Sequence, residues 1–329
     1  MTKEGATKAA EALWYTARGN AEIRQEALLP PRPGEVRVRA LFGALSRGTE
    51  ALVLGGRVPA SEFERMRAPF MAGNFPFPVK YGYATVGEIE EGPVELAGRK
   101  VFALHPHQTR FNISQDAVVP LPKTVPPQRA VLAANMETAL NAMWDAAPSA
   151  ADRIAVVGAG AVGAMVAFLC GCLPGAEVTL VDINAGRADV ARQLGVGFAK
   201  PDDAKGDCDV VFHASGTAAG LNSAIALGGD EATVIELSWY GEGSVPAVLG
   251  GSFHSRRLRL ISSQVGKVAS SHRSRWTHAR RLGAALNLLA DPRLDALIAP
   301  AVRFADLPSR LPGLLDHNAG AIAQLISYD

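Results

Sequence analysis

A glycine-rich turn near the middle of the chain has the residue types and spacing that bind a dinucleotide. Gly158, Gly160 and Gly163 follow a short apolar run and open an apolar stretch of helical length. The first glycine permits a tight turn, the second lets the backbone approach a pyrophosphate, and the third lets a helix pack closely on a strand. Ala161 and Val162, in the first turn of that helix, offer unpaired N–H groups to the phosphates. The alternative is a packing turn without a ligand.

An acidic residue follows this turn at the spacing expected for a ribose-binding carboxylate. Asp182 ends the next predicted strand,. A carboxylate there accepts hydrogen bonds from a 2′-hydroxyl and repels a 2′-phosphate, which favours NAD(H) over NADP(H). Arg187 lies nearby, and three roles remain open for it: a solvated position on its helix, stacking near the adenine, or contact with a phosphate.

Two further strand ends in this region carry polar or aromatic residues. Ser215 and Gly216 follow the third predicted strand, and Ser238 and Trp239 follow the fourth. The carboxyl ends of parallel strands line the crevice in which such sheets bind their cofactors. We therefore expect these four residues at the dinucleotide site.

Alternating strands and helices must position these residues. Predicted strands at 154–157, 177–181, 208–215 and 232–239 alternate with predicted helices at 161–172, 185–194 and 216–227. This pattern predicts an α/β fold with a doubly wound parallel sheet. Earlier residues read instead as strands and turns. Among them, Val36, Val38 and Ala40 alternate with Arg37 and Arg39, as on two faces of a strand,.

Composition narrows the class of protein. The chain has 329 residues, 48% of them hydrophobic, and a net charge of +1. This length and hydrophobic content are enough for two hydrophobic cores. The net charge gives no sign of a nucleic-acid-binding surface. Three cysteines form no disulfide framework, and the first residues carry no signal-peptide core, so we expect a cytoplasmic protein,. The apolar segment 154–174 has the length of a membrane span, but its glycines and Pro174 favour strand, turn and buried helix.

Several stretches of the chain resemble the medium-chain dehydrogenase/reductase superfamily, of the zinc-type alcohol dehydrogenase group. They are "LPPRPGEVRVRAL", "FPVKYGYATVGEIEEG", "AGRKVFAL", "VDINAGRADVARQLG" and "DVVFHASG". The stretch "GALSRGTEALVLGG" is similar to bacteriochlorophyllide dehydrogenase-like proteins. The resemblance covers essentially the full length. It implies a β-rich GroES-like domain at residues 1–122 and 298–329, a Rossmann domain at 123–297, a nicotinamide cofactor and a homodimer.

The zinc ligands of that family are missing. The resemblance aligns Ser46, Tyr83 and Ala134 with the three catalytic ligand positions, although Glu137 lies one helical turn further on. A catalytic zinc needs three nitrogen, sulfur or carboxylate ligands from the protein. The four-cysteine lobe of the structural zinc is absent as well. We therefore expect no zinc.

Without a metal, another group must give a proton to the reacting oxygen or stabilise its charge. The resemblance places Tyr83 and Ser46 in the substrate cleft, Tyr83 as proton donor or oxyanion partner and Ser46 as an orienting donor. The alternative for Tyr83 is packing in the space of the metal. Gly48 lacks the hydroxyl of the family's proton relay. The resemblance also aligns Arg47 with a residue that contacts the cofactor pyrophosphate.

Two histidines in "LHPH" complete the set of candidates. The resemblance places His105 at the wall of the substrate pocket, where its ordinary pKa near neutrality suits a general acid or base,. The alternatives are a hydrogen-bonded loop histidine, or a metal site shared with His107. The basic runs "FHSRRLRL" and "SHRSRWTHARR" have three possible interpretations: a solvated face, the rim of a subunit contact, or a surface that binds an anionic partner,.

These residues predict a zinc-independent, NAD(P)(H)-dependent oxidoreductase. It would move hydride between the nicotinamide and a carbonyl or alcohol carbon of a small molecule, without nucleic-acid or membrane partners. A reductase of enones or quinones is the alternative within the same fold, since it needs less help from a metal. A non-catalytic dinucleotide-binding sensor is the alternative from another class.

Overall fold

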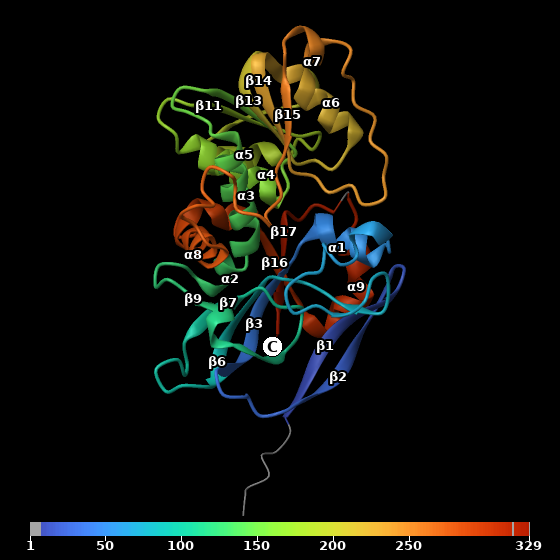
Figure 1. The fold of residues 1–329 in the computed structure, drawn as a ribbon, viewed down its shortest axis with the longest axis vertical. Helices are drawn as coiled ribbons and strands as arrows, with labels where there is room; N and C mark the ends of the chain where they lie inside the picture. The colour runs from blue at the N-terminus through green and yellow to red at the C-terminus, as the bar shows by residue number, and fades with distance from the viewer. Residues whose placement is uncertain (1–7, 318, 329) are drawn as a thin grey trace, which may run out of the picture. The chain divides into compact units, whose positions relative to one another are not determined.

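The computed structural model describes residues 8–317 and 319–328, which form two compact units (Figure 1). The first unit holds the described residues up to Ala134 and from Ile298 onward, and the second unit is Asn135–Leu297. The sequence placed the two boundaries at residues 122 and 298.

The first unit consists mainly of strands. Its strands are β1 (Lys8–Ala17), β2 (Asn20–Leu28), β3 (Glu35–Leu45), β4 (Ala72–Gly73), β5 (Val79–Lys80), β6 (Thr85–Glu91), β7 (Lys100–Ala103), β8 (Arg110–Ser114), β9 (Val118–Pro120), β16 (Ile298–Arg303) and β17 (Ala323–Ser327). Its helices are α1 (Arg47–Leu54), α2 (Pro127–Ala130) and α9 (Leu307–Leu314), with short 3₁₀ turns at η1 (Ala60–Glu62), η2 (Gln115–Ala117) and η5 (Phe304–Asp306).

Two sheets organise this unit. One has the strand order β2-β1-β5-β4, and the other β16-β17-β3-β6-β7-β9, with β8 also paired to β3. The C-terminal strand β17 runs antiparallel to β3 and so closes a sheet begun near the N-terminus. The segment around α2 belongs to this unit because α2 packs against β3 and β6. The division therefore falls after residue 134, later than the sequence placed it.

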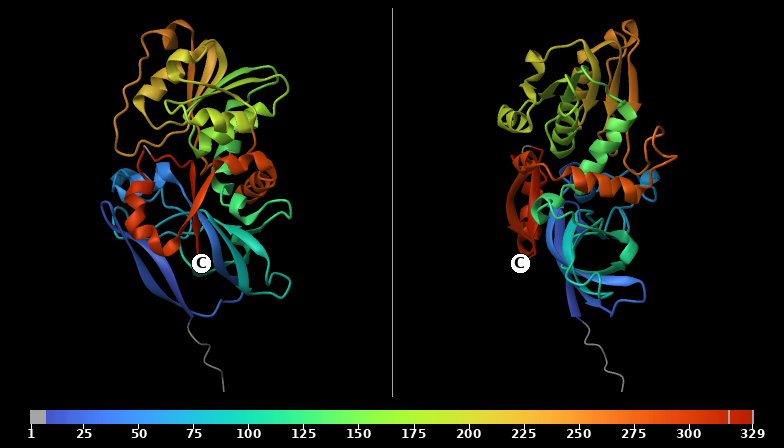
Figure 2. Two further views of the ribbon diagram at one scale, coloured as in Figure 1. Left: turned by 180° about the vertical axis from the view of Figure 1, so that it is seen from behind. Right: turned by 90° about the vertical axis from the view of Figure 1, so that its left-hand side faces the viewer.

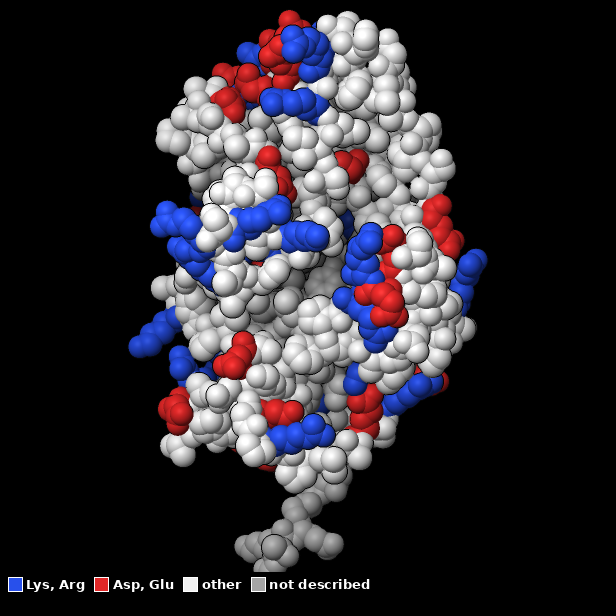
Figure 3. Space-filling model, viewed as in Figure 1, with Lys and Arg blue, Asp and Glu red and all other residues white. Residues whose placement is uncertain are grey.

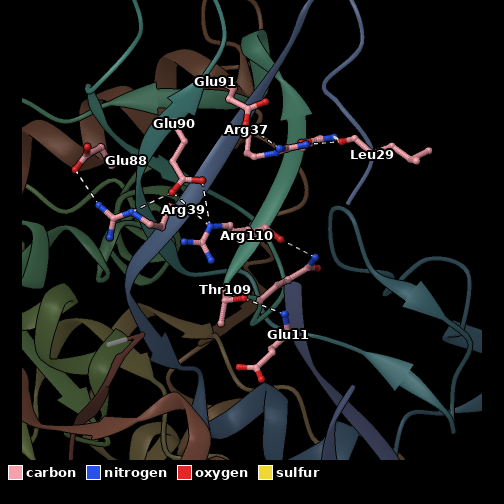
Figure 4. Close-up of polar contacts among 11 residues, drawn as sticks. Glu11, Leu29, Arg37, Arg39, Glu88, Glu90, Glu91, Thr109 and Arg110 are labelled. Atoms are coloured by element: carbon pink, nitrogen blue, oxygen red, sulfur yellow. Dashed lines mark hydrogen bonds and ion pairs between the residues drawn. The ribbon is translucent and has the colours of Figure 1, made fainter. Parts of the chain in front are cut away.

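Strand β3 shows the expected alternation with one difference. Val36, Val38 and Ala40 are buried in the core, but Arg37 is also only 2% exposed. Its guanidinium donates to Asn112, to the carbonyl of Leu29 and, at 2.9 Å, to Glu91 (Figure 4). These partners replace water around the charge, so Arg37 is buried on the polar face of the strand,.

Neighbouring charged side chains form further ion pairs across the sheet. Arg39 pairs with Glu88 and Glu90, and Arg110 of β8 also reaches Glu90 (Figure 4). The alternating charges therefore join β3, β6 and β8 by side chains as well as by backbone hydrogen bonds.

The second unit alternates strands and helices. After α3 (Ala133–Ala146), which begins at the unit boundary, come β10 (Arg153–Val157), α4 (Ala161–Gly171), β11 (Glu177–Val181), α5 (Arg187–Leu194), β12 (Gly197–Ala199), η3 (Pro201–Asp203), β13 (Cys208–His213), α6 (Ala218–Leu227), β14 (Gly228–Glu236), α7 (Ser252–Ser255), β15 (Arg259–Ser262), α8 (His278–Leu288) and η4 (Pro292–Leu297).

The strands of the second unit form one parallel sheet, in the order β12-β11-β10-β13-β14-β15. The order reverses after β10, because β11 and β13 flank it on opposite sides. Helices α4 and α5 lie on one face of this sheet and α6 on the other (Figures 1 and 2). The predicted doubly wound sheet beside a β-rich domain is confirmed.

The apolar segment 154–174 forms β10 and the buried helix α4, as expected. Among the described residues, no helix has the length and hydropathy needed to cross a membrane.

Candidate active site and dinucleotide site

The glycine turn of the second unit joins β10 to α4 with very little space around it. Gly158 has φ +107°, and a Cβ there would lie 2.6 Å from the backbone nitrogen of Ser215. A Cβ on Gly163 would lie 1.9 Å from the carbonyl oxygen of Gly158, so only glycine lets α4 begin this close to the turn. A Cβ on Gly160 would meet nothing within 4 Å. That open side, next to the first N–H groups of α4, fits the approach of a pyrophosphate.

Asp182, just after β11, is tied to this turn. One carboxylate oxygen accepts the backbone N–H of Ala159 at 2.7 Å, and the other accepts that of Asn184 at 2.8 Å. A carboxylate has about four lone-pair positions, so Asp182 keeps acceptor capacity for ribose hydroxyls.

The burial of the neighbouring arginine, Arg187, excludes one of its predicted roles. Arg187 is the first residue of α5 and is 8% exposed. Its side chain is therefore not a solvated face of the helix, and that interpretation is wrong. Stacking near the adenine and contact with a phosphate stay open.

The ends of β13 and β14 are joined by a polar cluster that the sequence did not reveal. His213 has a fully buried side chain, and it lies 2.8 Å from Glu236 through Nδ1 and 2.7 Å from the Ser215 hydroxyl through Nε2. Tyr240 donates to the same glutamate at 2.9 Å. Burial raises the pKa of Glu236, but the bonds from His213, Ser238 and Tyr240 outweigh it and the net shift is downward.

This cluster fixes the predicted cofactor residues. Ser215 is held by His213, and the Gly216 N–H donates to the Ser238 hydroxyl at 3.1 Å. Trp239 is half-buried in the following loop. The histidine in "DVVFHASG" was the available sequence signal, but its partner Glu236 lies 23 residues away.

In the first unit, the structure brings the two predicted hydroxyls together. Ser46 precedes α1, and the Tyr83 hydroxyl donates a short hydrogen bond to its Oγ. Burial raises the pKa of Tyr83, and its hydrogen bonds with Ser46 and Thr49 oppose this shift only in part. The phenol therefore keeps its proton at neutral pH. Thr49, which the sequence analysis did not select, adds a third hydroxyl.

The buried carboxylate of Glu50 is hydrogen-bonded to the backbone of Ser46. Glu50 of α1 accepts the Ser46 backbone N–H at 2.7 Å, the Tyr15 hydroxyl at 2.5 Å and the Nε2 proton of His107 at 3.0 Å. His107 approaches the Tyr328 hydroxyl at 3.4 Å through its other ring nitrogen. Burial and the Glu50 charge raise the pKa values of Tyr15 and Tyr328.

His105 is packed rather than poised for proton transfer. Its ring stacks on Phe111 with centroids 3.6 Å apart, and Nδ1 donates to the Pro106 carbonyl at 2.9 Å. Burial lowers the pKa of His105 to about 3. The imidazole is neutral at physiological pH, which favours the hydrogen-bonded loop histidine over the general acid.

Arg47 makes contacts within the first unit. One of its terminal nitrogens donates to the carbonyls of Ala319 and Ala321, both at 2.7 Å. These bonds join the start of α1 to the segment before β17.

The side chains do not supply the ligands of a catalytic zinc. Ser46 and Tyr83 contribute hydroxyls, Ala134 contributes nothing, and Glu137 forms a buried ion pair with Arg281 at 3.0 Å,. Within residues 8–317 and 319–328, no three His, Cys, Asp or Glu side chains are grouped as metal ligands.

Comparisons with known proteins agree with this architecture. No family model matches the chain. D-guloside 3-dehydrogenase of Escherichia coli is 25% identical in an alignment of 319 positions, and the match covers 86% of this chain and 90% of that protein. L-idonate 5-dehydrogenase of Escherichia coli superposes with a TM-score of 0.79 at 13% identity, covering 98% of this chain and 99% of that one.

Two further solved structures carry a cofactor. A protein of Sinorhizobium meliloti bound to NADP has a TM-score of 0.76 at 17% identity, covering 97% of this chain and 99% of its own. An alcohol dehydrogenase of Escherichia coli complexed with NADH has a TM-score of 0.75 at 15% identity, with the same coverage of 97% and 99%. The fold expected from the resemblance is thus confirmed: the chain has the fold of these solved dehydrogenases, with a Rossmann-like parallel-sheet unit and a β-rich GroES-like unit.

Proposed function

We propose that the chain is a zinc-independent, NAD(H)-linked oxidoreductase acting on a carbonyl or alcohol carbon. The observation that carries this proposal is the Tyr83–Ser46 hydrogen bond, formed where the resemblance expects zinc ligands. A phenol that keeps its proton can donate it to an oxygen that gains negative charge as a carbonyl is reduced. Ser46 and Thr49 would orient that phenol and return a proton to it.

The second unit would hold the dinucleotide. Gly160 and the first N–H groups of α4 would take the pyrophosphate, and Asp182 the ribose hydroxyls,. The bound nicotinamide supplies or accepts a hydride. The bonds of Asp182 to the turn support a preference for NAD(H), because a 2′-phosphate beside this carboxylate would be repelled. Ser215, Gly216, Ser238 and Trp239 would complete the site.

The substrate class rests on the curated relative. D-guloside 3-dehydrogenase is named for oxidation of a sugar derivative, and it matches most of the chain. We therefore propose a secondary alcohol of a sugar-like molecule as the first class to test. The free thiols of Cys170, Cys172 and Cys208 agree with the proposed cytoplasmic location,.

The proposed homodimer has a candidate interface on the second unit. Strand β15 is at the edge of the parallel sheet, and its Leu260 and Ile261 are 40% and 37% exposed. Val248 and Leu249, which precede it, are exposed as well. An apolar edge strand is a ready surface for pairing with a second copy.

The test compares Tyr83→Phe with Tyr81→Phe, which removes a neighbouring phenol. Each purified protein is assayed with NADH and NADPH against aldehydes, ketones, enones and quinones, and with NAD⁺ against glycosides and polyols. We expect Tyr83→Phe to lower kcat by about 10²-fold or more, as for the loss of a general acid, and Tyr81→Phe to keep activity. Equal activity of the two variants would contradict the role of Tyr83.

Three measurements separate the rival functions. Elemental mass spectrometry of the folded protein should find zinc near zero per chain, and a value near one would overturn zinc independence. Turnover confined to enones or quinones would assign the alternative reductase. Tight NADH binding without turnover of any substrate would assign the sensor.

A further inference from the structure

A pocket on the second unit is lined by rings and arginines that the proposed reaction does not use. It is formed by the end of the segment between β15 and α8 together with the first turn of α8, and it has a volume of about 290 Å³. Its lining residues are Ser271, His272, Arg275, Trp276 and Arg280. This is the basic run "SHRSRWTHARR", and all of its lining belongs to one compact unit.

The pocket is rigidly built. His272 stacks on Trp144 of α3 with centroids 4.1 Å apart and planes 4° from parallel. Ser271 donates to the Trp144 carbonyl at 3.2 Å. Beneath the segment, the fully buried Arg281 donates to Glu137 at 3.0 Å, to Asn141 and to two backbone carbonyls. These contacts hold the segment against α3.

One arginine is already oriented inside the pocket. The guanidinium of Arg280 lies 4.0 Å from the centre of the Trp276 ring, and it donates one bond, to the Arg275 carbonyl at 2.7 Å. Stacking on the ring and this bond fix the plane of the guanidinium, while most of its donors stay unused. A fixed guanidinium loses little entropy when it binds an oxyanion.

The positive charge here is not balanced by carboxylates. Among the residues that the structure describes, the Arg273 and Arg275 side chains make no hydrogen bond or ion pair, and Arg280 meets no carboxylate. Several other arginines of this unit are paired with carboxylates, among them Arg192 with Asp189 and Arg257 with Glu231. Figure 3 shows the Lys and Arg side chains gathered over α8.

We propose that this pocket binds the phosphate group of a small phosphate ester. Arg275 and Arg280 take the phosphate oxygens, and the rings of Trp276 and His272 contact the organic part. A dianionic phosphate matches two guanidinium groups, which bind its oxygens in parallel pairs. The volume admits one small molecule and no folded partner.

The test titrates phenyl phosphate into the full chain, followed by calorimetry and tryptophan fluorescence. NADH is kept saturating throughout, because the first turn of α4 also presents N–H groups to phosphates. Inorganic phosphate is the second probe, and it lacks the ring. We expect one site, tighter for phenyl phosphate than for inorganic phosphate, with an affinity that falls as salt rises.

The decisive variant is Arg275→Gln with Arg280→Gln, matched by Arg257→Gln on the same unit. We expect the double variant to bind phenyl phosphate at least tenfold more weakly, and the control to bind as the wild type does. Unchanged NADH affinity and thermal midpoint show that the double variant is folded. Equal binding by wild type and double variant, or no wild-type binding at millimolar ligand, overturns the proposal.

A lipid headgroup and a free ester share this chemistry, and a sedimentation experiment separates them. Phosphatidylcholine vesicles with and without phosphatidic acid are mixed with the wild type and the double variant. Sedimentation of the wild type alone, and only with phosphatidic acid, assigns the site to a lipid phosphate. Phenyl phosphate binding without sedimentation assigns it to a free ester.

Discussion

The carboxylate of Glu50 lies 3.0 Å from Nε2 of His107, and neither side chain has any exposed surface. The ring of His107 also explains why residue 82 is a glycine. A Cβ on Gly82, which has φ +117°, would lie 2.7 Å from two atoms of that ring. The pair therefore joins α1 to the loop before β8, and it holds Ser46 through the backbone bond to Glu50.

Glu50→Ala should destabilise the protein strongly. It leaves His107, Tyr15 and the Ser46 N–H buried without their acceptor. Removing one partner of a buried pair lowers the free energy of unfolding by about 3–5 kcal/mol. Denaturant titration measures this. Glu88→Ala, which breaks a half-exposed pair with Arg39, should change it by less than about 1 kcal/mol,. Similar losses for both variants would contradict the buried network.

His105→Phe should reduce the sensitivity of the fold to acid. Because the folded pKa of His105 is about 3, the unfolded chain takes up a proton near pH 6.5 that the folded chain refuses,. His105 thus contributes stability above pH 6.5 that is lost as the pH falls toward 3. The slope of unfolding free energy against pH should decrease by about 1.4 kcal/mol per unit between pH 6 and 4.

The control for this experiment is His317→Phe, whose side chain is 86% exposed. We expect the wild-type slope for that variant. A wild-type slope for His105→Phe would mean that His105 titrates in the folded chain.

Asp182→Ser should weaken NADH binding and reduce the preference for NADH over NADPH. The variant removes the carboxylate that would accept ribose hydroxyls and repel a 2′-phosphate. It also frees the N–H of Ala159. We expect the Kd for NADH to rise tenfold or more, while the Kd for NADPH rises less. Fluorescence titration gives both values, with Asp189→Ser on the exposed face of α5 as control. An unchanged ratio of the two Kd values would contradict this assignment.

Leu260→Glu combined with Ile261→Glu should convert the proposed dimer to a monomer. Two carboxylates on β15 would be buried without partners when a second copy pairs with that edge. Light scattering after gel filtration measures the mass. Val94→Glu, at a residue 91% exposed on the first unit, should leave the dimer intact. A wild-type mass for the β15 variant would exclude this interface.

Local patterns in the sequence were enough to predict the frame of the second unit. The strand expected at 177–181 is β11 at the same bounds, and the glycine turn joins β10 to α4. Helix α8 begins at His278, where the Thr277 hydroxyl accepts the Arg280 N–H and caps the helix. Strand alternation and glycine spacing act over a few residues, so the sequence displays them directly.

The candidate sites depended on contacts between distant residues. Glu50 and His107 are 57 residues apart, and Ser46 and Tyr83 are 37 apart. The resemblance aligned Tyr83 and Ser46 with neighbouring ligand positions. Thr49 and Glu50 lie in the stretch "GALSRGTEALVLGG", which also carries the resemblance, but the sequence did not indicate that Thr49 meets Tyr83 or that Glu50 meets His107. The burial of Arg187, and the burial that lowers the pKa of His105, also come from packing.

The sequence by itself therefore determined the order of strands and helices and the glycine-rich turn between β10 and α4, because backbone conformation and hydrophobic periodicity are local properties. Only the tertiary structure decided which hydroxyls and carboxylates meet, and which pKa values shift. Burial and hydrogen bonding are set by the side chains that packing brings in from elsewhere in the chain.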